Sequence, residues 1–339
     1  MRNRQIAVFE DNDMQEYIKN NRNVVTPIIG MILVILVFGF ATGWKNYTAN
    51  NLQTILNQSY SLAILAMGLI FIFAHGGIDF SCASVMAFSG LIAGLLMQIG
   101  VPVVICGIAC VLVGTICSVI TGALTVVFGV PAFISSICMM NICRGIVMAV
   151  IATNAVSVTV DVSAFKSWPV KIIVLIVVFI VTTFLLSKSL IGRYNKAIGK
   201  NSVAAEQSGI SVKKYRLLAY MISGVCVGIA AFFLLCRTGR MATGFANGLQ
   251  LEVIVALMLG GLPPRGGYRS NIVSAIAGPL ILTVLGNGLV ILGMDDLMTE
   301  GIKGLVFLAV VFVNYRGSSE SITGLFGKIG LDSKKMLLK

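Results

Sequence analysis

The chain has 339 residues, of which 57% are hydrophobic and only 11% are charged. A soluble domain carries about 25% charged residues, so this composition excludes a water-facing globular protein. The formal net charge of +12 comes from bases scattered between apolar segments, which favours loops facing anionic lipid over a nucleic-acid surface. We therefore predict an all-α, polytopic membrane helix bundle.

Ten apolar segments follow one another along the chain, and a helix of about 20 such residues crosses a hydrocarbon core of roughly 30 Å. They cover residues 24–40, 52–73, 84–99, 101–127, 130–151, 170–186, 217–235, 251–262, 272–292 and 302–313. The eighth and the tenth have only about twelve residues each, which predicts helices that take in flanking polar residues or are broken or tilted inside the bundle.

Polar tails, residues 1–23 and 316–339, flank a single transmembrane domain over residues 24–315. If both tails lie inside the cell, 18 of the 25 lysines and arginines are cytoplasmic and five lie on the other side. Cytoplasmic loops of membrane proteins carry an excess of these residues. We therefore predict that both termini are cytoplasmic.

The apolar segments contain many small residues. Gly90 with Gly94 and Gly224 with Gly228 are spaced four apart, which favours close helix packing in lipid. All eight cysteines lie in or beside apolar segments and are interpreted as small buried hydrophobic residues. We expect neither disulfides nor a metal site from them.

The longest internal hydrophilic segment runs from residue 187 to residue 216. Asn201 or Ser202 is placed to cap a short helix over residues 203–208, which Gly209 then ends. Such a helix on a cytoplasmic loop suits docking into a groove of a partner protein, although an idle interfacial helix has the same pattern. The residues of this docking element are Ala204, Ala205, Glu206, Gln207, Ser208 and Gly209.

A second polar feature, His75-Gly76-Gly77-Ile78-Asp79-Phe80-Ser81, separates the second and third apolar segments. An Asp at bilayer depth costs roughly 2.5–3.5 kcal/mol, so it normally faces a cavity or a partner. The favoured interpretation is that the glycines make a turn and Asp79 caps the next helix. A proton relay between Asp79 and His75 is the alternative.

Three further ionisable residues, Arg144, Glu252 and Lys303, fall inside apolar segments and are expected to pair with one another or with Asp79. Enzyme motifs are missing: the chain has no GxxxxGK[ST], HExxH, GxSxG or CxxC sequence. We therefore predict no catalytic residue, no metal, no cofactor and no ATP binding by this chain. The candidate residues for a solute pathway and its gate are Gly76, Gly77, Asp79, Ser81, Arg144, Glu252 and Lys303.

The Gly-Gly-Ile-Asp-Phe-Ser string at 76–81 resembles the Gly-Gly-Ile-Asp-Leu-Ser stretch of ABC-importer permeases of the ribose/galactose/arabinose type. Further resemblances keep the family's order over roughly residues 45–315. They are VPAFI at 130–134, RG at 144–145, GRY at 192–194, AIG at 197–199, AAEQSGI at 204–210, GRM at 239–241, LE at 251–252, GG at 260–261, NG at 287–288 and KGL at 303–305.

Some positions depart from the family pattern. Phe80, Cys82 and Ala83 replace the usual Leu and Val-Gly, and Val253 stands where an Asp is frequent. Residues 262–268 (LPPRGGY) replace a glycine loop rich in Ser and Thr. These departures bear on the cargo and on the gate rather than on the class of protein.

The resemblance implies a ten-helix permease of the bacterial inner membrane that carries a monosaccharide. Its partners would be a second permease copy, identical or different, cytoplasmic ABC ATPase subunits, an extracytoplasmic sugar-binding protein and membrane lipid. The short helix in segment 187–216 would then couple the bundle to the ATPase. The rival class is a proton- or ion-coupled secondary carrier of small polar solutes built on Asp79 and His75. A membrane-embedded transferase is a third class, and no motif supports it.

Overall fold

The computed structural model describes residues 22–262, 267 and 270–316. The regular elements of these residues are all helices, thirteen α-helices and one 3-10 helix, which confirms the all-α prediction. In chain order they are α2 (Arg22–Ala41), η1 (Lys45–Tyr47), α3 (Ala49–Ala74), α4 (Cys82–Gln98), α5 (Val103–Val126), α6 (Ala132–Thr153), α7 (Ser163–Lys166), α8 (Trp168–Ser187), α9 (Leu190–Lys200), α10 (Ser202–Gln207), α11 (Val212–Thr238), α12 (Leu249–Leu259), α13 (Ser274–Ile291) and α14 (Asp296–Arg316).

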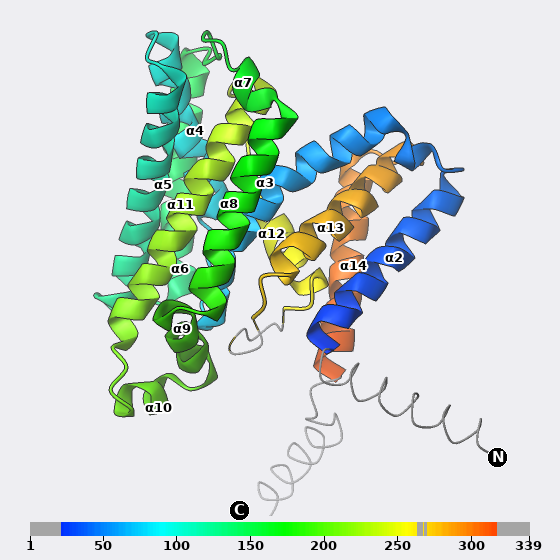
Figure 1. Ribbon diagram of the computed structural model, residues 1–339. Coiled ribbons are helices and arrows are strands. Elements are labelled where there is room, and N and C mark those ends of the chain that lie inside the picture. Colours follow the sequence, from blue (N-terminus) through cyan, green and yellow to red (C-terminus); the bar gives the residue numbers. More distant parts are fainter. Residues whose placement is uncertain (1–21, 263–266, 268–269, 317–339) are drawn as a thin grey trace, which may run out of the picture.

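Helix α3 joins two groups of helices (Figure 1). It packs against α11 on the side of the α4–α11 group and against α13 on the side that also holds α2, α12 and α14. Every residue from Ser59 to Ala74 is buried. A helix that is apolar all round is expected to lie inside a bundle, and α3 does so because it is covered from both sides.

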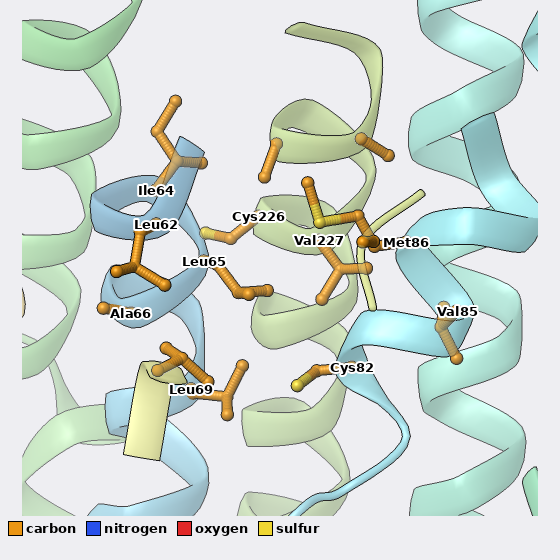
Figure 2. Packing of buried hydrophobic residues seen from close by; sticks show 14 of the residues in the cluster. Leu62, Ile64, Leu65, Ala66, Leu69, Cys82, Val85, Met86, Cys226 and Val227 are labelled. Carbon is orange, nitrogen blue, oxygen red and sulfur yellow. The ribbon is translucent and has the colours of Figure 1, made fainter. Parts of the chain in front are cut away.

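The core of the larger group lies between α3, α4 and α11. Figure 2 shows Leu65 of α3 beside Cys226 of α11 and Val227 of α11 beside Met86 of α4, with Leu69 of α3 below Leu65. All five side chains are at most 5% exposed. Apolar residues of moderate size interdigitate here, which fixes α3 relative to α11.

The contact between α5 and α11 is made by backbone atoms. A Cβ atom built on Gly228 would lie 2.4 Å from the Cα of Val111, and one on Gly224 would lie 2.6 Å from the Cα of Thr115. The prediction of close helix packing is therefore confirmed for this pair. Gly90 and Gly94 instead make room for side chains of loop residues, Phe245 and Val156 respectively.

Six described helices are long and apolar enough to cross a membrane: α3, α5, α6, α8, α11 and α13. Shorter apolar helices cover residues 29–41, α4 and α12. Each of the ten predicted segments corresponds to a helix, and α12 has only 11 residues, as expected. The tenth is longer than predicted, with 21 residues in α14, because polar residues at its start continue the helix.

One cysteine departs from the sequence interpretation. Cys138 of α6 is exposed, whereas the other seven thiols are buried. All eight are free, and the described residues contain no group of three His, Cys, Asp or Glu side chains arranged to hold a metal. Apart from residues 22, 23 and 316, the two predicted tails lie outside the described residues.

Candidate functional site

The break between α3 and α4 begins with a glycine turn. Gly76 has a φ of 82°, and its N–H donates to the carbonyl oxygen of Phe73 at 2.9 Å. The N–H of Gly77 donates to the carbonyl oxygen of Ile72 at 3.0 Å. These two bonds form a Schellman motif, whose first residue after the cap is usually glycine because the left-handed conformation is strained for other residues. The turn predicted from the sequence is present.

Asp79 lies in this break and is completely buried. Its Oδ1 accepts hydrogen bonds from the backbone N–H of Ser81 at 2.8 Å and from the Ser81 hydroxyl at 2.6 Å, one residue before α4 begins. These contacts form an Asx turn just before α4. No side chain of the described residues caps α4, whose N-cap residue is Ser81, so the prediction that Asp79 caps this helix is wrong. The Oδ2 atom of Asp79 has no partner among the described residues.

No hydrogen bond joins His75 to Asp79 in the described part of the chain. The imidazole is 6% exposed, and its ring centroid lies 6.0 Å from that of Tyr220 on α11. Its Nε2 atom is buried and has no described partner. The geometry therefore contains no Asp–His pair of the kind that the proton-relay hypothesis needs.

Arg144 of α6 anchors a loop rather than pairing with an acid. Its guanidinium donates from Nη1 to the carbonyl oxygen of Phe245 at 3.1 Å and from Nη2 to Oδ1 of Asn247 at 2.9 Å. Both partners lie in the loop between α11 and α12, so Arg144 holds this loop against the side of α6. The expected pairing of Arg144 with Asp79 or Glu252 is not found among the described ion pairs.

Beside Arg144, α6 turns a face with polar and small residues outward. Cys138, Asn141 and Gly145 are exposed and follow one another at helical spacing. Asn141 is the tenth and Arg144 the thirteenth of 22 residues in α6, so both lie near its middle. The Asn141 side chain has no hydrogen-bonding partner among the described residues, and an unpaired amide at bilayer depth is unfavourable against lipid. Sequence reasoning passed over Asn141, although a lone Asn inside an apolar segment was a usable signal.

Glu252 and Lys303 form an ion pair, one of those expected from the sequence. The Nζ atom of Lys303 on α14 lies 2.5 Å from Oε1 of Glu252 on α12 and 2.8 Å from Oε1 of Glu300. The side chains of Lys303 and Glu252 are 15% and 22% exposed. This pair ties the short α12 to α14.

The segment between α8 and α11 contains two helices, of which only α10 was predicted. Asn201 is the cap: its Oδ1 accepts from the N–H groups of Val203 and Ala204 at 3.0 and 3.1 Å. Gly209, with a φ of 82°, donates its N–H to the carbonyl oxygen of Glu206 at 3.0 Å. The preceding helix α9 was missed because its apolar residues are few, although they recur at helical spacing.

The outward face of α10 differs from the one assumed for the sequence. Ala205 is only 5% exposed and faces the bundle, so the expectation that it forms part of an exposed docking face is wrong. Val203, which is 62% exposed, and the exposed residues Ala204, Glu206 and Gln207 form the outward face instead. The reason is the packing of α10 on α9 and α11, which no helix pattern of six residues can reveal.

A shallow hollow lies near α7, at the end of the bundle opposite α9 and α10 (Figure 1). It holds none of the predicted site residues. Asp161 lines it, and hydrogen bonds from the backbone N–H and the hydroxyl of Ser163 lower the pKa of its carboxyl group below the usual value. The lining residues are Val158, Val160, Asp161, Val162, Ser163, Lys166 and Gly239.

Comparison with known proteins places these features in a family. The model of the branched-chain amino acid transport system / permease component family matches residues 51–311, and the chain belongs to this family. It is therefore a multi-pass permease component of the bacterial inner membrane.

Individual relatives are similar along most of their length. The chain is 29% identical to the probable ABC transporter permease protein YphD of Escherichia coli K12, over 89% of this chain and 92% of the relative. It is 29% identical to the ribose import permease protein RbsC of the same strain, over 84% and 91%. It is 30% identical to the D-allose transport system permease protein AlsC of that strain, over 83% and 88%. No solved structure shows a significant match.

Proposed function

We propose that this chain forms the sugar passage of an ABC importer and that ATP hydrolysis takes place on a partner subunit. Relatives of this chain are named for the import of ribose and of D-allose, which supports a monosaccharide as cargo. The chain itself has no phosphate-binding glycine loop. The remaining partners are a second permease copy and an extracytoplasmic sugar-binding protein.

The observation that carries this proposal is the geometry of α10. The helix is capped at both ends, packs on α9 and α11, and turns Val203 and its polar neighbours outward. A helix of six residues is marginal by itself, so α10 depends on its caps and on its packing against α9 and α11, and its outward face remains free. We propose that this face docks into a groove of the ATPase, with Gly209 setting the exit angle of the chain.

The passage itself runs along the exposed polar face of α6 in this proposal. Cys138, Asn141 and Gly145 lie at its centre, beside the loop that Arg144 holds. Amide groups and open space suit the hydroxyl groups of a sugar and do not suit acyl chains. The second permease copy would close the passage from the other side. Asp79 and Ser81 are completely buried, so they act on the shape of the α3–α4 break rather than on the sugar.

We propose that both termini are cytoplasmic. The first turn of α2 and the last turn of α14 point toward the end of the bundle where α9 and α10 lie (Figure 1). The excess of lysine and arginine in the same segments favours the cytoplasm for that end.

Charge placed on α10 tests the docking role. Ala204→Glu and Val203→Glu put a carboxylate on the outward face without filling a buried site, so the permease should reach the membrane at the normal level. Both variants should fail to retain the ATPase in a pull-down. The matched control is Ala155→Glu, an equally exposed alanine at the other end of the bundle, which should retain it.

Uptake measurements separate this proposal from the secondary carrier. Sugar uptake into intact cells should stop when ATP is depleted and should continue when an uncoupler removes the proton gradient. Uptake that follows the proton gradient, together with ATPase binding that Ala204→Glu leaves unchanged, would contradict the proposed function.

A further inference from the structure

Helix α9 approaches the break between α3 and α4 closely at Gly199. A Cβ atom built on Gly199 would lie 2.1 Å from the carbonyl oxygen of Ala74 and 2.9 Å from the Cα of Gly267. Any residue other than glycine at position 199 would force α9 away from the last turn of α3. Ala74 immediately precedes His75 and the glycine turn that leads to Asp79.

Helix α9 is joined to α10 by a very short connection. Asn201 is the single residue between α9 and α10. Its N–H donates to the carbonyl oxygen of Ala197 in α9 at 3.1 Å, while its side chain caps α10. With one residue between the two helices, we expect movement of α10 to be passed on to α9.

The inner face of α9 contains an unsatisfied amide one turn before Gly199. Asn195 is completely buried, and neither its Oδ1 nor its Nδ2 has a partner among the described residues. Buried amides are normally hydrogen-bonded, and an unpaired one marks a contact whose partners lie elsewhere or in another arrangement. Asn195 can therefore gain two hydrogen-bonding partners that the described residues do not supply in this arrangement.

We infer that α9 transmits the movement of α10 to the α3–α4 break through the contact of Gly199 with Ala74, and that Asn195 gains its hydrogen bonds when this contact shifts. The inference rests on the proposed docking of the ATPase at α10. Gly199 and Asn195 are thus positioning residues: they touch neither sugar nor ATP, and they act through the break that contains the Asp79 turn. Two packed arrangements of one helix junction are the kind of bistable element that couples distant sites.

Three variants of the full chain, assembled with ATPase and binding protein in proteoliposomes, test the inference. In Gly199→Ala the ATPase should still bind, whereas the sugar transported per ATP hydrolysed should fall about tenfold, a typical size for coupling between two sites. Asn195→Leu removes the unpaired amide, so the thermal midpoint should equal or exceed that of the unmodified chain while the same ratio falls. Gly228→Ala is the steric control, because its Cβ would overlap backbone of α5 and not the contact between Gly199 and Ala74.

Gly228→Ala should lower the thermal midpoint and leave sugar per ATP unchanged. A normal ratio in both Gly199→Ala and Asn195→Leu would overturn the inference, as would an equal fall in Gly228→Ala. If Gly199→Ala does not reach the membrane, Asn195→Leu decides alone. The proposed docking of the ATPase at α10 is rejected by a different result, namely that the Ala204→Glu variant retains the ATPase. If Ala204→Glu loses the ATPase but Gly199→Ala transports sugar at the normal ratio, only the route through α9 is rejected.

Discussion

Replacing Lys303 by methionine should loosen α14 from α12. The change removes the cation from a group of two carboxylates and leaves Glu252 as an unpaired charge in a site where it is 22% exposed. Breaking a buried pair costs about 3–5 kcal/mol, and because this one is partly exposed we expect about 2–3 kcal/mol. Almost all of this free-energy cost arises from the unpaired Glu252, since Glu300 is 60% exposed and remains solvated.

Hydrogen exchange of the amides in α14, measured by mass spectrometry in detergent micelles, reports this local opening directly. A loss of this size should speed exchange about thirty- to hundredfold, since 1.4 kcal/mol corresponds to a factor of ten. Glu300→Gln is the matched control and should change exchange by less than about fivefold.

The double variant Glu252→Gln/Lys303→Met removes the stranded charge and should recover most of the protection. Equal acceleration in Lys303→Met and Glu300→Gln would refute the reasoning, because the exposed carboxylate would then matter as much as the partly buried one. So would a double variant that exchanges faster than Lys303→Met, because the two effects would then add instead of cancelling.

Three further predictions concern the break, the passage and the topology. Asp79→Asn should keep more transport activity than Asp79→Leu, since an amide oxygen still accepts the Ser81 N–H; equal and total loss in both would favour a proton role for Asp79. Cys138, the exposed native thiol, should react with a charged, membrane-impermeant methanethiosulfonate in the assembled importer, and bound sugar should protect it. The control variant Ile146→Cys/Cys138→Ser, with its thiol on the apolar edge of α6, should not react. Modification of Cys138 by apolar maleimides alone would place this face in lipid. Cysteines introduced at Gln5 and Lys335 should stay unlabelled by an impermeant reagent in intact cells, and labelling from outside would show that the termini are not cytoplasmic.

The sequence by itself predicted those features that depend on neighbouring residues, namely the helices and their ends. Ten apolar segments predicted helices because backbone groups in lipid must be satisfied within each segment. Gly76 and Gly209 marked two helix ends, because both positions require a positive φ. Asn201 and Ser202 were the two candidate caps of α10, and Asn201 is the cap, because its side-chain oxygen accepts from two N–H groups nearby. Each of these features depends on residues within one or two turns of one another.

Only the tertiary structure decided which residues meet across the bundle. Lys303 pairs with Glu252 rather than with Asp79, and Arg144 bonds to a loop rather than to an acid, because helix packing fixes which side chains come within hydrogen-bonding distance. Ala205 is buried and Val203 is exposed because α10 rests on α9 and α11. The contact of Gly199 with Ala74 joins residues far apart in the chain through backbone atoms, and a glycine in the sequence does not reveal which segment it allows to approach.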